Sequence, residues 1–422
     1  VDVLVTFSQF VLGGDIASTC EFGLLAPRFG PVGTTLDLAG FWPCYLAAAQ
    51  SGFEIVRLGH DAAEPPVVAA GAFATNHYFL LNQANLYLKA LPYIQDLLVA
   101  LRDRRSLPLQ QQQPEAGSFA DRGAPNPFHV AAYAAKFVWR FVRRKARVVL
   151  GYRDCWGILV VPGGFDDLRL DAAKPVPNPK GGFLADPFLA RRDGQVALFV
   201  EEYDFSIERG FISAYTWDGA SFVDRRPIIE EPFHMSYPFI FEYDGRLLMC
   251  PETSESGQIR LYECLDYPYE WRYLQTVMDG VSAVDTMFFD LGDRWCMLTN
   301  TDRSGTGDNC NELCIFFADS PLSTSWTPHQ DNPVKVDSIG ARNGGYFRDG
   351  DRFFRFGQRQ GFDQYGAALS IYEVSKLDEE ALEEKEVRVI LPDFSKGACG
   401  SHHLTCLEDI SVVDAVRFVR NP

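Results

Sequence analysis

The second part of the chain repeats one structural signal, and this signal constrains the fold more than any other feature. After about residue 147, short runs rich in Val, Ile, Phe and Tyr alternate with Asp-Gly pairs. These pairs are Asp193-Gly194, Asp218-Gly219, Asp244-Gly245 and Asp349-Gly350. An Asp-Gly pair between two β-type runs is a strong hairpin signal. We therefore expect this part of the chain to consist of antiparallel hairpins.

Each hairpin unit opens with a short sequence segment, called its opening word below, that contains polar or aromatic residues. The words ADPFL, SYPFIF, VDTMFF, ARNGGYF and SHHLTC place Asp186, Tyr237, Asp285, Arg342 and His402 at intervals of 51, 48, 57 and 60 residues. A period of about 50 residues with about four strands per unit is typical of a β-propeller. Five openings predict a mainly β fold with five blades, and a β-sandwich with irregular repeats is the alternative.

The last unit has too little chain after His402 to form a complete blade. The segments RVVLGY and WGILVVP precede the first opening and have the composition of strands. We expect them to complete the last blade, so that N- and C-terminal strands close the ring and leave no exposed sheet edge.

The first 146 residues read differently, so we predict an α-rich or mixed accessory region at 1–146 and a propeller at 147–422. Leucines at three- and four-residue spacing predict a helix over 76–105, and Pro92 is expected to end one helix and begin another. A Gln-, Pro- and Gly-rich loop is expected at 107–127. The segments before residue 76 have no clear assignment, and a leucine-rich helical pattern returns only at 376–386.

Composition excludes several classes of protein. The formal net charge is −17, which argues against a general nucleic-acid binder. No apolar run reaches the length of a membrane-spanning helix. The ten cysteines contain no CxxC pair, so we expect small buried thiols in a reducing, cytoplasmic compartment.

The blade openings also predict where chemistry would occur. The first strand of each propeller blade lines the central channel, so the five opening residues should face one pocket. Glu252, and Gln358 or Gln360, begin loops near the same end of the blades. Two Asp and one Glu on separate blades suit glycosyl transfer or hydrolysis, which needs an acid and a base or nucleophile. The alternative is structural: Asp before Pro is a common turn residue, and Glu201 and Glu202 are expected to be solvated.

These words also resemble a known family. FLADPFL, ALFVEEYD, HMSYPFIFEYDGRLLMCPE, ARNGG, FRFGQ, QYGAALS, SHHL and VVDA are similar to the five-bladed propeller of the glucosamine inositolphosphorylceramide transferase type, with bacterial polysaccharide-biosynthesis relatives. More distantly they resemble the propellers of glycoside hydrolase family 43. The resemblance covers about residues 150–418. One departure is ARNGG, where the family often has ARPAG.

The resemblance implies a carbohydrate-active enzyme, with a glycosyltransferase favoured over a hydrolase. Carried over by motif, it implies Asp186, Glu252 and Asp285 as the acidic set and His234 and Tyr237 as pocket residues. Adding the residues that converge by position gives an expected substrate-binding set of His234, Tyr237, Arg342, Gln358, Tyr365 and His402. The implied partners are an activated, nucleotide-type sugar donor and a glycan or glycolipid acceptor. A furanosidase-type glycosidase and a non-catalytic glycan-binding propeller remain as alternatives.

Other site signals are weak. GxGxxG after a strand and GxxxxGK[ST] are both absent. The DxD triplet at Asp349–Asp351 coincides with a hairpin signal and is interpreted as a turn. No cofactor is assigned; a divalent metal held by His402 or His403 is one interpretation, and a core histidine is the other. For Arg342, binding a donor diphosphate and bracing the fourth blade through backbone carbonyls are both open.

The segment from His129 to Arg147 predicts an amphipathic helix. It gathers six Lys and Arg residues in an otherwise acidic chain, with Val130, Tyr133, Phe137, Val138, Phe141 and Val142 at helical spacing. One interpretation is peripheral membrane contact through residues 129–147. The other is a helix that packs on the propeller with its charges turned to water.

Overall fold

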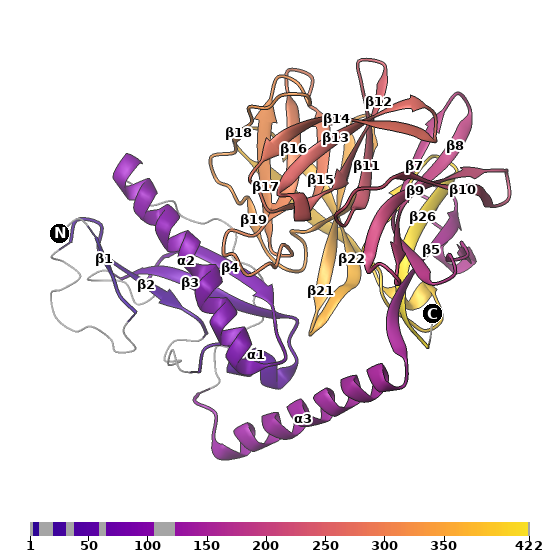
Figure 1. The fold of residues 1–422 in the computed structure, drawn as a ribbon. Coiled ribbons are helices and arrows are strands. Elements are labelled where there is room, and N and C mark those ends of the chain that lie inside the picture. Colours follow the sequence, from indigo (N-terminus) through magenta and orange to yellow (C-terminus); the bar gives the residue numbers. More distant parts are fainter. Residues whose placement is uncertain (1–2, 8–19, 31–37, 59–64, 105–122, 421–422) are drawn as a thin grey trace.

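The computed structural model describes residues 3–7, 20–30, 38–58, 65–104 and 123–420 (Figure 1). The part after residue 150 is mainly β and contains five sheets. The first sheet comprises β7 (Gly182–Arg192), β8 (Gln195–Asp204), β9 (Arg209–Trp217) and β10 (Phe222–Ile229). The second comprises β11 (Ser236–Tyr243), β12 (Arg246–Glu252), β13 (Gln258–Asp266) and β14 (Glu270–Asp279).

The next two sheets continue this order. The third contains β15 (Ala283–Asp290), β16 (Trp295–Thr301), β17 (Glu312–Ala318) and the short β18 (Thr327–Pro328) and β19 (Lys335–Val336). The fourth contains β20 (Asn343–Asp349), β21 (Arg352–Gly361), β22 (Gln364–Leu377) and β23 (Leu382–Ile390). The helical pattern at 376–386 is therefore wrong. The backbone N–H groups of Glu380 and Ala381 donate to the Asp378 carboxylate, which stabilises a turn between two strands.

The fifth sheet joins distant segments of the chain. It contains β24 (Ala398–Gly400), β25 (Leu404–Cys406), β26 (Ile410–Arg420), β5 (Tyr152–Pro162) and β6 (Lys174–Pro175). β26 pairs with β5 in antiparallel register along its whole length, from Ile410↔Pro162 to Arg420↔Tyr152. The expectation that an upstream segment joins the last unit is confirmed.

The Asp-Gly signals are confirmed as turns. Asp193-Gly194 and Asp244-Gly245 connect paired strands, Asp218-Gly219 lies between β9 and β10, and Asp349 ends β20 with Gly350 in the turn that follows. In the first two, both residues have positive φ, between 51° and 79°. This conformation matches the twist of a two-residue hairpin and suits Asp-Gly.

The N-terminal region contains a sheet that sequence patterns did not assign. Its strands are β1 (Leu4–Val5), β2 (Leu24–Arg28), β3 (Gln50–Leu58) and β4 (Val67–Ala74), in that order, with α1 (Phe41–Leu46) nearby. α2 (Phe79–Arg104) packs on this sheet and is a single helix with Pro92 inside it. The predicted break at Pro92 is wrong. Leu86, Ala90, Ile94 and Leu97 are buried on both sides of it, and their packing offsets the lost hydrogen bond.

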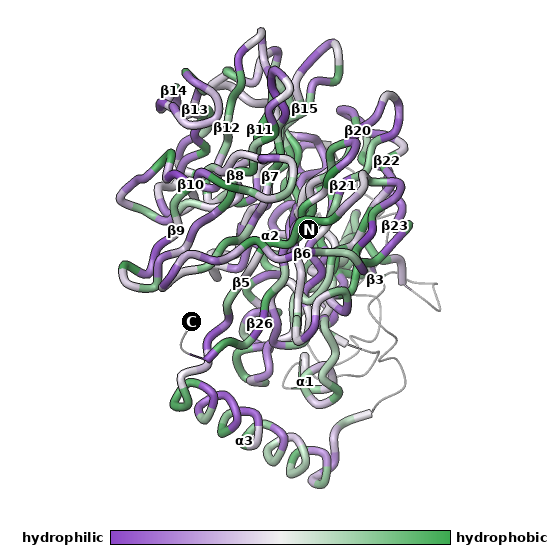
Figure 2. Tube along the Cα trace, turned by 90° about the vertical axis from the view of Figure 1, so that its right-hand side faces the viewer, coloured by the Kyte–Doolittle hydropathy of each residue, from purple (hydrophilic) through white to green (hydrophobic). Residues whose placement is uncertain are grey.

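Among the described residues, one long helix links the N-terminal region to the five sheets. α3 (Pro127–Val149) runs from the N-terminal region to the start of β5 (Figure 1). Apolar residues concentrate within the sheets, as the colouring of Figure 2 shows. The expected loop at 107–127 falls largely outside the described residues. In the described chain, no helix is both long enough and apolar enough to cross a bilayer.

All ten cysteines lie among the described residues. Each is a free thiol that is buried or half-buried, as the sequence pattern predicted.

A candidate active site of buried carboxylates

Three of the predicted site residues share one unusual backbone conformation. Asp186, Tyr237 and Asp285 have φ values of 49°, 45° and 50°, in the left-handed region that non-glycine residues rarely adopt. The pairing of each strand with the next slips at that point, between Ala185 and Phe188 in the first case. A bulge of this kind redirects a side chain. The repeated opening words therefore encode a repeated bulge.

Arg342 joins two of the predicted carboxylates. Its Nε donates to Oδ2 of Asp285 at 2.5 Å, and its Nη2 lies 3.5 Å from Oε2 of Glu252. Arg342 is largely buried, and its guanidinium lies 5.2 Å from the centre of the Tyr365 ring. The positive charge of Arg342 is therefore balanced by carboxylates inside the protein. Its polar side-chain contacts in the described structure are with these carboxylates and the Cys310 thiol, in place of the backbone carbonyls considered above.

A second chain of contacts runs through His402. Its Nδ1 lies 2.5 Å from Oδ2 of Asp414, and its Nε2 lies 3.7 Å from Oδ1 of Asp186. Backbone N–H groups of His402 and His403 donate to Oδ1 of Asp414. The His402 ring stacks on Trp156 with 3.9 Å between ring centres. The histidine is thus held in one orientation between two acids.

Burial shifts the protonation of these groups. It raises the pKa of Asp186 to about 7, against the opposing effect of His402 and with further raising by Asp285 and Asp414. It also raises the pKa of Asp285 to about 7, although Arg342 acts in the opposite direction. Burial disfavours charge on His402, but Asp414 and Asp186 outweigh it and raise the His402 pKa. Two carboxyl groups therefore titrate near neutral pH, as acid–base chemistry requires.

Glu201 belongs to the same cluster, although sequence reasoning assigned it to solvent. It is 7% exposed, and burial together with the charges of Asp186 and Glu252 raises its pKa well above the usual range. Its neighbour Glu202 is 3% exposed and pairs with Arg225 and Ser213. Both faces of β8 are covered, so alternation does not expose either residue.

The remaining predicted binding residues lie around this cluster at different depths. Gln358 is fully buried and donates from Nε2 to Asp285 at 2.8 Å. Gln360, the alternative, instead accepts from the backbone N–H of Gly366. The Tyr237 hydroxyl accepts from the backbone N–H of Gly345, and His234 lies 3.6 Å from Glu201. Tyr365 is 41% exposed, at the outer side of the cluster.

One group of described residues has the donor set for a metal ion. Oxygen and nitrogen atoms of Asp186, His402 and Asp414 lie within 4.8 Å of one another. However, the short His402–Asp414 contact already uses one ligand atom of each. An ion held through these two atoms would have to replace that contact, whereas Nε2 of His402 faces the Asp186 carboxylate on the other side of the ring.

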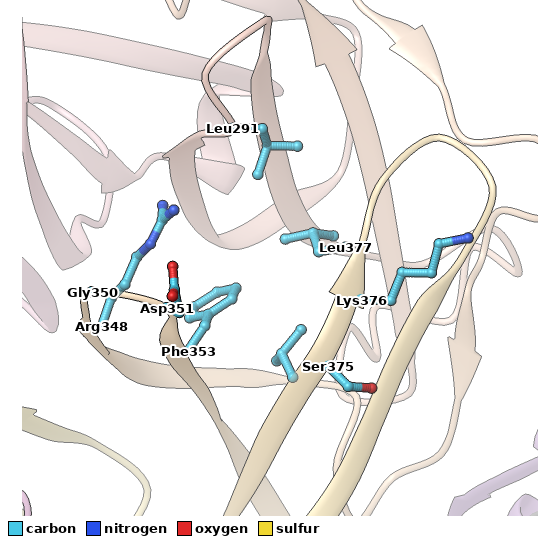
Figure 3. Close-up of a pocket in the computed structure, with 9 residues that line it drawn as sticks. Leu291, Arg348, Gly350, Asp351, Phe353, Ser375, Lys376 and Leu377 are labelled. Atoms are coloured by element: carbon cyan, nitrogen blue, oxygen red, sulfur yellow. The ribbon is translucent and has the colours of Figure 1, made fainter.

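A shallow hollow lies beside the turn between β20 and β21, at the end of these strands away from the carboxylate cluster. Its volume is about 220 Å³, and Arg348, Gly350, Asp351, Phe353 and Lys376 are among the residues that line it (Figure 3). The DxD triplet lies at this hollow, in the turn between β20 and β21, as the turn interpretation predicted. The predicted acidic set is at the other end of these strands.

Comparison with known proteins gives a consistent result. The family model described as "Glucosamine inositolphosphorylceramide transferase 1, N-terminal" matches residues 172–407. The chain is 33% identical over 227 residues to glucosamine inositolphosphorylceramide transferase 1 of Arabidopsis thaliana, covering 51% of this chain and 28% of the relative. The Oryza sativa subsp. japonica protein of the same name is 30% identical over 252 residues, covering 54% and 32%. The chain thus spans about a third of the length of these relatives.

Solved structures overlap more loosely. The catalytic domain of a Coprinopsis cinerea GH62 α-L-arabinofuranosidase is 11% identical with a TM-score of 0.42, covering 57% of this chain and 95% of that one. A thermostable family-43 glycoside hydrolase is 13% identical with a TM-score of 0.41, covering 58% and 97%. These overlaps are too loose to transfer a function. The family model, in contrast, covers more than half of the chain and includes most of the carboxylate cluster, so the protein belongs to the family of the glucosamine inositolphosphorylceramide transferase 1 N-terminal region.

Proposed function

We propose that the protein is a glycosyltransferase that moves a sugar from a nucleotide-activated donor to a glycolipid or polysaccharide acceptor. The carboxylate cluster carries this proposal. Asp186, Glu201, Glu252 and Asp285 come from three sheets, and two of them have pKa values of about 7. Burying this many acids together costs free energy, and such sites are typical of catalysis.

In this proposal, the five sheets are the blades of a propeller, and residues 1–146 form an accessory region. The first strands of the sheets support this arrangement, because β7 contacts β11, β11 contacts β15, β15 contacts β20, β20 contacts β25 and β25 contacts β7. The acids would then line the end of a central channel.

The proposed roles follow from the contacts. Asp186 faces Nε2 of His402, so it is placed to exchange a proton and act as acid or base. Glu252 Oε2 forms no hydrogen bond among the described residues and lies 3.5 Å from Arg342 Nη2, so beside this ion pair it can still accept from a substrate hydroxyl. Asp285 holds Arg342, and Gln358 Oε1 is likewise unpartnered within the described structure. Unpaired buried polar atoms are costly, and sugar hydroxyls would satisfy them.

Family membership supports the transferase class. The curated relatives are named for transfer of glucosamine to inositolphosphorylceramide. We therefore favour a hexosamine donor and an inositolphosphoryl lipid acceptor as the first pair to examine.

A second candidate is a glycan-binding module without turnover. The observation that favours it is the extent of the match, because the family model describes an N-terminal region and most of each relative lies outside the alignment. A binding module would hold the acceptor through the same unpartnered oxygens.

The test combines binding with product analysis. The protein is incubated with a panel of nucleotide sugars, with and without inositolphosphorylceramide, and products are identified by mass spectrometry. A transferase gives a glycosylated lipid and free nucleotide. Stabilisation by glycans without any product supports the binding module, and release of free sugar from aryl glycosides would indicate a hydrolase. Both outcomes contradict the transferase.

A further inference from the structure

α3 is amphipathic, and it packs on the protein with its cationic side inward. Lys136 donates to the backbone carbonyl of Tyr45 at 3.1 Å and lies 4.1 Å from the centre of its ring. The Arg140 guanidinium lies 4.6 Å from the Phe362 ring centre, and that of Arg147 lies 4.1 Å from the Phe418 ring centre. The alternative interpretation, a packed helix with its charges turned to water, is therefore wrong for half-buried Arg140 and Arg147, whereas Lys136 stays exposed.

The opposite side of α3 is apolar and exposed. Its large side chains are 48% to 84% exposed: Phe128, Val130, Val138, Trp139, Phe141, Val142, Val148 and Val149. A surface helix normally turns its apolar side to the core. Figure 2 shows α3 at the lower edge of the molecule, with open space beneath it. Tyr133 and Phe137, expected on the same apolar side, instead contact Phe79 and His77.

Exposed cations accompany this apolar side. Arg143, Arg144 and Lys145 are exposed, and two of them lie beside rings of the same helix: Arg143 is 5.2 Å from the Trp139 ring centre and Lys145 is 5.8 Å from that of Phe141. The helix contains no Asp or Glu, although the whole chain has a net charge of −17. This arrangement is complementary to an anionic membrane surface. The cations would face the acidic head groups, and the exposed rings and valines would face the acyl chains beneath them. A second copy of the chain would instead place like charges against one another.

We propose that α3 lies in the interface of an anionic membrane, with its apolar side among the acyl chains. This proposal is independent of catalysis. Its consequence for the site does rest on the proposed function. α3 leads directly into β5, and Trp156 on β5 stacks on His402 in the cluster. The hairpin turns at Gly194 and Gly350 are at the other end of the strands. The anchored helix would thus hold the site-bearing end of the strands near a lipid-linked acceptor.

The experiment uses sedimentation with phosphatidylcholine vesicles that contain about one third phosphatidylglycerol. Wild-type protein should bind at low salt and dissociate as salt rises. The R143E/R144E/K145E variant should bind about 100-fold more weakly, since each cation contributes about a factor of ten or less near such a surface. The V138S/F141S/V142S variant should lose at least about 10-fold, because it removes buried apolar area.

Matched controls change similar residues elsewhere. K174E/K180E/K396E reverses three other exposed lysines, and I207S/L265S/V387S removes three other exposed apolar side chains. Both should bind vesicles as the wild type does, and circular dichroism confirms folding of every variant.

A local readout comes from Trp139, which is 60% exposed. Lipids brominated on the acyl chain should quench the tryptophan fluorescence of the wild type more than that of W139F. Absence of vesicle binding at low salt, or equal loss in the control variants, would overturn the proposal. Concentration-dependent dimers that V138S/F141S/V142S abolishes, without vesicle binding, would assign this side of α3 to a second copy.

Discussion

At the scale of residues, the site gathers several ionisable side chains, and burial disfavours the charged forms of its carboxyl groups. Asp186 and Asp285 occupy left-handed backbone positions and have pKa values of about 7. A carboxyl group whose pKa is raised by folding stabilises the folded state at low pH, and this contribution is lost as pH rises through the folded pKa. Because of these two acids, the stability of the protein should fall as the pH rises from about 4 to about 7, and the loss should be complete above that range.

Asp186→Asn tests this cost. At pH 5 only part of the wild-type stability has been lost, because the folded-state carboxyl is still mostly protonated, so the variant should be only slightly more stable than the wild type. At pH 8 the wild type carries a buried charge, and the variant should be more stable by up to a few kcal/mol, since one pKa unit corresponds to about 1.4 kcal/mol. Thermal unfolding at both pH values measures the difference. An Asp186→Asn effect that does not change with pH would contradict the raised pKa.

Arg342→Gln tests the contact with Asp285. Removing the cation leaves two buried acids uncompensated, which should cost about 3–5 kcal/mol at pH 8. The cost should shrink at pH 5.5, where Asp285 is protonated. The double variant R342Q/D285N should recover stability at pH 8, as measured by urea unfolding. If the two single effects simply add, the contact does not couple these residues.

The residues that open each sheet could be predicted because their sequence segments repeat. The place of two acids in the site, Glu201 and Asp414, could not be predicted in this way. Glu201 lies in EEYD beside another glutamate, a pattern that suggests solvent exposure, and only the strands on both sides of β8 bury it. Asp414 follows two buried valines, and its partner His402 is 12 residues earlier, in the link between β24 and β25. Nothing local in VVDA marks this contact, although the motif itself was part of the family resemblance.

At the scale of elements, glycines allow the fourth and fifth sheets to approach each other. Gly345 has a φ of 110°, and a Cβ placed there would lie 2.2 Å from the backbone oxygen of Leu404. A Cβ on Gly344 would lie 2.4 Å from the backbone oxygen of His402. Both glycines of ARNGG therefore have a physical reason, because a Cβ at either position would meet backbone of the fifth sheet.

Gly345→Ala should therefore destabilise the protein by more than about 2 kcal/mol and disturb the Tyr237 hydroxyl contact. Gly181→Ala is the control, because its φ of 78° is also positive but a Cβ there meets nothing within 4 Å. It should cost only about 1 kcal/mol. Urea midpoints compare the two variants, and equal costs would mean that backbone conformation alone matters at Gly345.

At this scale the hairpins could be predicted from the sequence. The existence of α2 could also be predicted, but its continuity through Pro92 could not. Asp-Gly turns are local signals, and every one was confirmed. Pro92 is a local signal for a break, but long-range packing of the residues around it on the N-terminal sheet outweighs that signal. That sheet itself has short apolar strands without hairpin words, so its pairing could not be read from the sequence.

At the scale of the whole molecule, the N-terminal region is fastened to the third sheet by polar contacts. Buried Lys89 on α2 pairs with Asp308, and the Tyr93 hydroxyl donates to Glu312 at 2.6 Å. Gln50 on β3 donates to Asp337 and Ser338. Such contacts join elements more than 200 residues apart, which no sequence pattern predicts.

Lys89→Met should loosen this attachment. Lys89 holds the pKa of Asp308 below its usual range despite burial, so its loss leaves a poorly compensated acid. Calorimetry should then resolve an early transition for the N-terminal region, ahead of the main one. Lys376→Met is the control, because Lys376 pairs with Glu380 at the surface and should cost less than about 1 kcal/mol. Unchanged unfolding of Lys89→Met would show that the attachment depends on other contacts.

Turnover in amide variants tests the central claim of a carboxylate site most directly. Transfer from a nucleotide-activated hexosamine to inositolphosphorylceramide is measured for the wild type, Asp186→Asn, Glu252→Gln and the exposed-site control Glu242→Gln. The first two should lose about 10²–10⁴-fold in kcat while remaining folded. Glu242→Gln should match the wild type. If folded Asp186→Asn and Glu252→Gln both retain full turnover, the buried carboxylates are not the catalytic groups.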